Sequence, residues 1–169
     1  MNTKNGTMVF ATIALLGSTI TVASILSIPS PSTVYASHEF VANLSGQQEV
    51  PPVDTQAIGE AILVPDLPGN QTINYYVNAT GIQGATQGHI HSGAQGENGP
   101  VVASLFNFSS SQDEVGQKGY FTKSDLVGPM QGKNVSDLID AMKSNSTYVN
   151  FHTEQNPDGE IRGQIVDIK

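Results

Sequence analysis

The sequence predicts an all-β fold, a Greek-key or immunoglobulin-like β-sandwich of about eight strands with one short helix. Three observations carry this prediction. Short apolar stretches with period-two alternation recur roughly every ten residues, separated by Gly, Pro, Asn and Asp. Charged residues make up only 13% of the chain, and 17 glycines supply turns. The 169 residues include no cysteine, so a hydrophobic core must stabilise the fold without disulfides.

The predicted elements follow one another between clusters of turn residues. One helix is expected over residues 136–143, packed on a sheet edge, because apolar residues from Val135 to Met142 recur at helical spacing. Turns are expected at 65–70 and at 156–159, where Pro157 and Gly159 suit a type I turn. The predicted strands cover residues 38–44, 57–64, 72–78, 88–91, 101–106, 117–122, 147–152 and 160–168.

The first 36 residues are interpreted as an export signal. Lys4 precedes an uncharged apolar run over residues 8–28, and the small residues Val34 and Ala36 place a cleavage site after Ala36. Removal of residues 1–36 leaves one domain over residues 37–169. The run is also long enough to span a bilayer, so an uncleaved signal anchor is the alternative. Both interpretations place the domain outside the cytoplasm, either secreted or at the cell surface.

Asparagine sequons support the same location. Ser and Thr fill about one mature position in seven, so chance would produce only one or two N-x-S/T sequons. We therefore expect N-linked glycans, with Asn70 and Asn134 as the most favourable sites because they lie in a turn and just before the helix. The alternative is that Asn, Ser and Thr are simply abundant turn and edge residues here. The six sequons begin at Asn43, Asn70, Asn78, Asn107, Asn134 and Asn145.

The charge distribution excludes several classes of partner. The net charge is -8, and Arg162 with six scattered lysines cannot form a phosphate-binding surface. We expect no nucleic acid partner and no contact with anionic lipid, apart from the N-terminal segment if it remains uncleaved. The expected partner is an unidentified extracellular protein or a component of the cell envelope.

The histidines are the candidate ligand residues. Side chains alternate along a strand, so His89 and His91 share the outer face when Ile90 points to the core. The same alternation places Phe151 inside and His152 outside. Three imidazoles could bind copper or zinc. The alternative is a hydrogen-bonded polar cluster that orders loops over the sheet, with Asn150 or Glu160 as partners of the histidines.

Arg162 lies on the outer face of the last predicted strand. We expect it to be a structural arginine that pairs with a neighbouring carboxylate, and the alternative is that it binds an anion.

Five motifs in order resemble the chordin-type domain, CHRD. They are residues 44–52 (LSGQQEVPP), 88–93 (GHIHSG), 98–102 (NGPVV), 148–153 (YVNFHT) and 157–164 (PDGEIRGQ). The resemblance covers almost all of the mature chain and implies an extracytoplasmic β-sandwich module. The motif residues with an expected structural role are Glu49, Pro51, Pro52, Glu160 and Arg162.

A weaker likeness concerns copper,zinc superoxide dismutases, which are also Greek-key sandwiches. A His-x-His strand, a later histidine and an Arg-bearing strand after a Gly-rich turn are similar to their layout. That family, however, uses more metal-bound histidines than the four present here, and it has a disulfide that this chain cannot form. We therefore expect a non-catalytic binding or structural module, with a histidine-dependent copper- or zinc-binding protein, redox-active in some settings, as the alternative.

Overall fold

The computed structural model describes residues 38–67, 69 and 71–168. The predicted export signal and the sequon at Asn70 lie outside these residues. Candidate membrane-spanning helices are absent from the part of the chain that is described. The helix and strands are β1 (Glu39–Ser45), β2 (Ile58–Asp66), β3 (Thr72–Thr80), β4 (Ala85–Ser92), β5 (Val101–Gln112), β6 (Val115–Phe121), α1 (Val135–Lys143), β7 (Thr147–Thr153), β8 (Ile161–Gln164) and β9 (Val166–Ile168).

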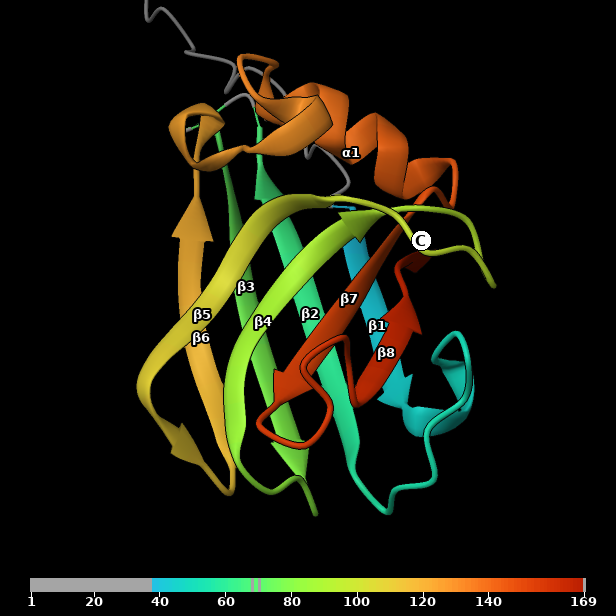
Figure 1. Ribbon diagram of the computed structural model, residues 1–169. Helices are drawn as coiled ribbons and strands as arrows, with labels where there is room; N and C mark the ends of the chain where they lie inside the picture. The colour runs from blue at the N-terminus through green and yellow to red at the C-terminus, as the bar shows by residue number, and fades with distance from the viewer. Residues whose placement is uncertain (1–37, 68, 70, 169) are drawn as a thin grey trace, which may run out of the picture. The chain divides into compact units, whose positions relative to one another are not determined.

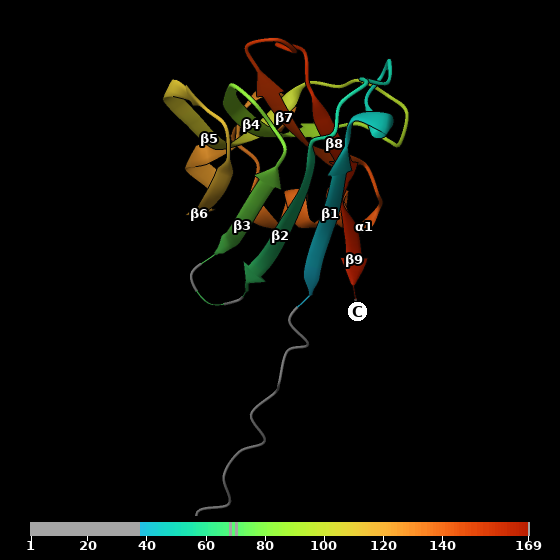
Figure 2. The same ribbon diagram turned by 90° about the horizontal axis from the view of Figure 1, so that it is seen from below.

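The nine described strands form one antiparallel sheet. Its order is β5-β4-β7-β8-β1-β2-β3-β6, and β9 pairs with β1. A tight connection joins β5 to β6, the two ends of this path, so the sheet curves into a nearly closed, barrel-like arrangement (Figures 1 and 2). The predicted all-β class with one helix is confirmed. The finer arrangement, an immunoglobulin-like or Greek-key sandwich, stays a prediction.

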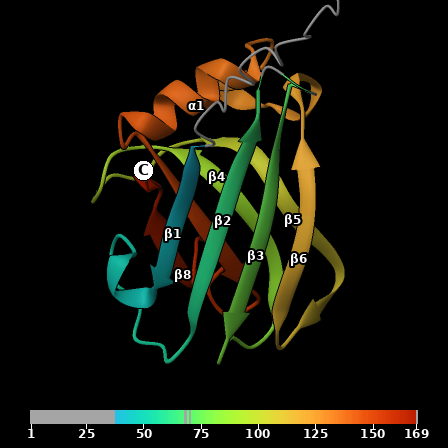
Figure 3. The same ribbon diagram turned by 180° about the vertical axis from the view of Figure 1, so that it is seen from behind.

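The core lies inside the curved sheet and follows from alternation along the strands. Phe40 and Leu63 point inward from β1 and β2, and Val149 and Phe151 from β7, all with no exposed surface. The predicted inward direction of Phe151 is therefore confirmed. The helix α1 lies across one end of the strands, not along a sheet edge as predicted, and its apolar residues join the same core (Figures 1 and 3).

Two strand predictions differ from the structure. The strand predicted to end at 106 continues as β5 to Gln112, through a serine-rich stretch whose side chains are largely exposed. The strand predicted over 160–168 is divided at Ile165 into β8 and β9. The division changes the partner strand, since β8 pairs with β7 whereas β9 pairs only with β1. Ile165 itself remains fully buried.

The strand β7 is buried on both faces. All seven of its residues are buried, although Asn150 and His152 point away from the apolar core. The loop over residues 93–99 and the turn over 154–160 make hydrogen bonds to the side chains of this outer face. A second, polar interior therefore lies outside the barrel, between the sheet and its own loops.

Candidate metal centre

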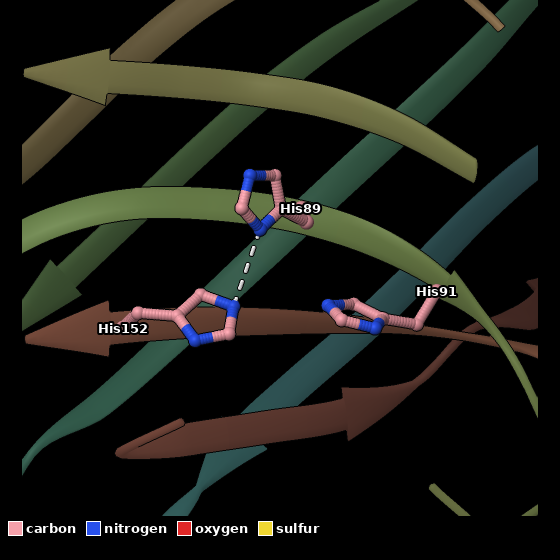
Figure 4. Close-up of side chains that lie close together, drawn as sticks. All are labelled: His89, His91 and His152. Carbon is pink, nitrogen blue, oxygen red and sulfur yellow. Dashed lines mark hydrogen bonds between the residues drawn. The ribbon is translucent and has the colours of Figure 1, made fainter. Parts of the chain in front are cut away.

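Three of the four histidines meet on the outer face of two neighbouring strands. His89 and His91 belong to β4, and His152 belongs to β7, which pairs with β4. His89 lies opposite Asn150 in the register, one side-chain step from His152. Figure 4 shows the three rings turned toward a common centre. The structure brings together the three histidines that alternation placed on outer strand faces, and His91 and His152 are only 8% and 6% exposed because the two loops cover them.

The ring nitrogens lie close enough to share one ion. One nitrogen atom from each histidine lies within 4.8 Å of the other two. The Nδ1 atom of His89 and the Nε2 atom of His152 are joined by a hydrogen bond of 3.2 Å, in which His89 donates because Nδ1 of His152 already donates to a carbonyl. Two nitrogen ligands at about 2.0 Å from a tetrahedral ion are separated by about 3.3 Å, so this pair already has the spacing of a metal site. The His91 nitrogen has to approach the other two by up to about 1.5 Å, a change that side-chain rotation provides.

Backbone carbonyls fix the orientation of two of the rings. The Nδ1 atom of His91 donates to the Gly99 carbonyl at 2.9 Å, and that of His152 donates to the Pro157 carbonyl at 3.0 Å. A neutral imidazole that donates from Nδ1 carries its lone pair on Nε2. The Nε2 atom of His91 is buried and has no hydrogen-bond partner among the described residues. Metal-bound histidines are typically held this way, by a hydrogen bond from the nitrogen that does not bind the ion.

Burial keeps the cluster uncharged at neutral pH. The pKa of His89 is lowered to about 4, chiefly by burial and to a smaller extent by the neighbouring His152 and His91. Burial also lowers the pKa of His91 and of His152, although the hydrogen bonds to Gly99 and Pro157 act in the opposite direction. Neutral imidazoles can bind a metal ion without first releasing a proton. The three imidazoles are thus neutral at pH 7, and His89 has to move its proton from Nδ1 to Nε2 before Nδ1 can bind an ion.

Tyr148 connects the cluster to Arg162. The rings of His91 and Tyr148 stack at 4.9 Å, and the Arg162 guanidinium lies 3.9 Å from the centre of the Tyr148 ring. Arg162 donates to the Asn98 side chain at 2.7 Å and to the Glu97 carbonyl at 2.8 Å. These contacts hold the 93–99 loop over His91. The loop also needs glycine at position 99, because a Cβ atom there would collide with the Ser92 carbonyl oxygen.

Two predictions about polar partners are wrong. Within the described residues no carboxylate lies within ion-pair distance of Arg162, whose partners are instead an amide and a carbonyl. Asn150 and Glu160 do not hydrogen-bond to the histidines. The Glu160 carboxylate accepts hydrogen bonds from Thr55, Thr153 and Asn156, which stabilise the turn after β7.

Glu49 lies in the same polar interior as the histidines. It follows β1 and a short 3₁₀ turn, is 6% exposed, and precedes the exposed Pro51 and Pro52. The Oε1 atom of Glu49 and the Oδ1 atom of Asn150 are buried acceptors without a hydrogen-bond partner in the described chain. Both face Gly159, where a Cβ atom would lie 2.7 Å and 2.6 Å from them. Glu49 therefore lies close to Asn150 and Gly159 on the covered face of β7, whereas Pro51 and Pro52 remain at the surface.

The alternation that places His152 on the outer face also places Tyr148 there, but the sequence assigns Tyr148 no role. The Tyr148 ring contacts His91 of β4 and Arg162 of β8. These contacts depend on which strands are neighbours of β7, and a strand pattern does not show that. The carbonyl groups of Gly99 and Pro157 carry no side-chain signal and could not be found in this way. The fourth histidine, His38, lies apart from the cluster and pairs with Asp167 at 3.1 Å.

The fold and site define an all-β, barrel-like module that carries a three-histidine cluster beneath its loops. The sequence model of the CHRD domain matches residues 40–165, so the chain belongs to the CHRD domain family, as its motifs predicted. No similar sequence was found among curated proteins, and no similar fold among solved structures. Redox activity of the superoxide dismutase kind stays a prediction without support from these comparisons.

Proposed function

We propose that this protein is a non-catalytic, extracytoplasmic CHRD module that binds one copper or zinc ion. The ligands are Nδ1 of His89 and Nε2 of His91 and His152. The observation that carries the proposal is the pair of hydrogen bonds to Gly99 and Pro157, which place the lone pairs of His91 and His152 on Nε2. The His91 lone pair has no partner among the described residues, and the His152 lone pair accepts from His89. An orphaned acceptor such as Nε2 of His91 costs free energy unless something binds it.

The donor set supports a late first-row metal. Three neutral imidazoles suit copper and zinc, whereas calcium and magnesium require oxygen ligands. Copper(II) should bind more tightly than zinc, because affinity of a given nitrogen site increases toward copper in the divalent series. Access comes from the side of His89, which is the least buried of the three ligands.

The ion would also stabilise the covering loops. Each loop touches a ligand through a backbone carbonyl, Gly99 for one and Pro157 for the other. Binding would immobilise both rings and therefore both loops. A module of this kind can present one ordered loop surface to an envelope or extracellular partner in the presence of metal.

Metal titration of the tag-free protein tests the proposal. We expect submicromolar affinity for copper(II), lost in both His91→Ala and His152→Ala and kept in His38→Ala, because His38 lies apart from the cluster. Affinity weaker than about 10 µM, or unchanged by both substitutions in the cluster, would contradict it. The histidines would then act as the polar cluster that only orders the loops.

The extracytoplasmic location is part of the same proposal. Family membership supports it, since CHRD domains occur in secreted and extracellular proteins. The described sequon asparagines support it further, because Asn43, Asn107, Asn134 and Asn145 are exposed and Asn78 is half-buried. Intact mass of protein from the native host is the test. We expect a start at or near Ser37 and added glycan mass; the full unmodified chain would contradict both.

A further inference from the structure

Most exposed apolar side chains of the described protein gather on one face. Seven large apolar residues are at least one third exposed, and only Val127 lies elsewhere. The other six are exposed side chains of β2, β3, β6 and β9, and β1 joins β9 to β2 in the same sheet. They are Ile58, Val64, Tyr76, Tyr120, Val166 and Ile168. An exposed apolar face of this kind usually has an occupant.

One sequon lies on this apolar face beside a tyrosine. Asn78 begins the sequence Asn78-Ala79-Thr80 on β3, and Tyr76 precedes it by two residues. Residues two apart on a strand share a face with Cα atoms about 6.7 Å apart. Tyr76 is 48% exposed, and the Asn78 amide makes no side-chain hydrogen bond to any described residue. A sugar attached to Asn78 would therefore start next to an open aromatic ring.

The neighbouring strand leaves room for that sugar. Gly116 of β6 lies opposite Asn78, and a Cβ atom at this position would meet nothing within 4 Å. Beyond Tyr76, along β3, a shallow hollow of about 420 Å³ continues over the face toward Tyr120. Asn74 and Lys118 also line this hollow and can hydrogen-bond to hydroxyl groups. A glycan that extends from Asn78 along β3 would thus meet an aromatic ring first and polar side chains beyond it.

We propose that Asn78 carries an N-linked glycan whose first pyranose ring packs on Tyr76 and covers the apolar face. One side of a pyranose ring presents C–H bonds, which pack well on the electron-rich face of an aromatic ring. Asn78 is the only one of the six sequon asparagines that has an aromatic residue two positions earlier. This inference rests on the proposed export of the chain and is independent of metal binding.

Two measurements test the inference. Glycopeptide mass spectrometry of protein from the native host should find Asn78 occupied. A double-mutant cycle in a eukaryotic secretory host then compares the wild type, Tyr76→Ala, Asn78→Gln and the double variant. We expect Asn78→Gln to lower Tm by about 3 °C when Tyr76 is present and by less than half as much in the Tyr76→Ala background. Tyr76 is exposed, so its replacement should leave the fold intact.

Asn107→Gln is the matched control. Asn107 is an exposed strand asparagine with Leu105 two residues earlier, so its replacement should change Tm equally in both backgrounds. An unoccupied Asn78 would overturn the inference, as would equal Tm losses from Asn78→Gln in the two backgrounds. A stable dimer of the native protein with Tyr76 protected by the second copy would also overturn it. Recovery of the unmodified protein in the cytoplasmic fraction of the native host would show instead that the proposed export is wrong.

Discussion

Replacing Glu49 by glutamine should stabilise the protein above neutral pH. Burial raises the pKa of Glu49 from 4.5 to about 7, although Arg162 and the Val50 backbone N–H lower it in part. The native state therefore keeps a proton that the unfolded chain releases between these two values. The free energy of unfolding falls as pH rises from about 4.5 to about 7, and the full loss persists above that range. Glutamine cannot ionise and removes this loss.

The expected size follows from the shift. Raising the pKa from 4.5 to about 7 corresponds to about 3 kcal/mol at pH 8. Solvent screening of the part of the side chain nearest the surface reduces this to about 1 to 2 kcal/mol. Urea unfolding at pH 4 and at pH 8 measures the effect. At pH 4 the free energy of unfolding of Glu49→Gln should be nearly equal to that of the wild type, and at pH 8 it should be higher.

Glu160→Gln is the matched control, because it makes the same chemical change at an equally buried carboxylate. Glu160 accepts from Thr55, Thr153 and Asn156, so an NH₂ group would face existing donors. We expect a loss of about 1 to 3 kcal/mol at pH 8. If Glu49→Gln also destabilises at pH 8, or if its effect is the same at both pH values, the reasoning about the buried carboxyl group is refuted.

Three further predictions follow from packing, backbone geometry and metal linkage. Phe151→Ala removes a fully buried ring and should cost about 3 to 5 kcal/mol in urea unfolding, and a loss below about 1 kcal/mol would reverse the assigned strand face. Gly159→Ala should destabilise more than Gly96→Ala: both residues have positive φ, but only at Gly159 would a Cβ atom lie 2.5 Å from the Asn150 amide. Thermal unfolding that showed equal losses would contradict this. Free metal at about 100 times Kd should stabilise the native state by about 2.7 kcal/mol, and the gain should vanish in His91→Ala.

Local pattern predicted the elements well because each depends on neighbouring residues. Alternation around Phe151 identified both the strand and its buried face, and the helical spacing from Val135 to Met142 identified α1. The polar end of β5 was missed because Ser109 to Ser111 lack an apolar face, although backbone pairing extends there. The division of the last strand at Ile165 was missed because apolar and polar residues continue to alternate through this position. Only the partner strand changes there, from β7 to β1, and the sequence does not show which strands pair.

The candidate site was predictable only in part. Alternation placed His89, His91 and His152 on the outer face, but the pairing of β4 with β7 joins segments far apart in the sequence. Burial of that face could not be predicted either, since loops cover it through backbone carbonyls at Gly99 and Pro157. A carboxylate partner was predicted for Arg162 because opposite charges can be recognised in a sequence. Its actual partner is the side chain of Asn98, and nothing in the sequence sets this asparagine apart from the others.

The most direct test of the account is anomalous diffraction from crystals grown with one equivalent of copper or zinc. We expect a single peak at about 2.0 to 2.1 Å from Nδ1 of His89 and from Nε2 of His91 and His152. The hydrogen bonds to the Gly99 and Pro157 carbonyls should remain in place. A peak at other residues, or none among the three rings, would contradict the proposal that this cluster is a metal centre.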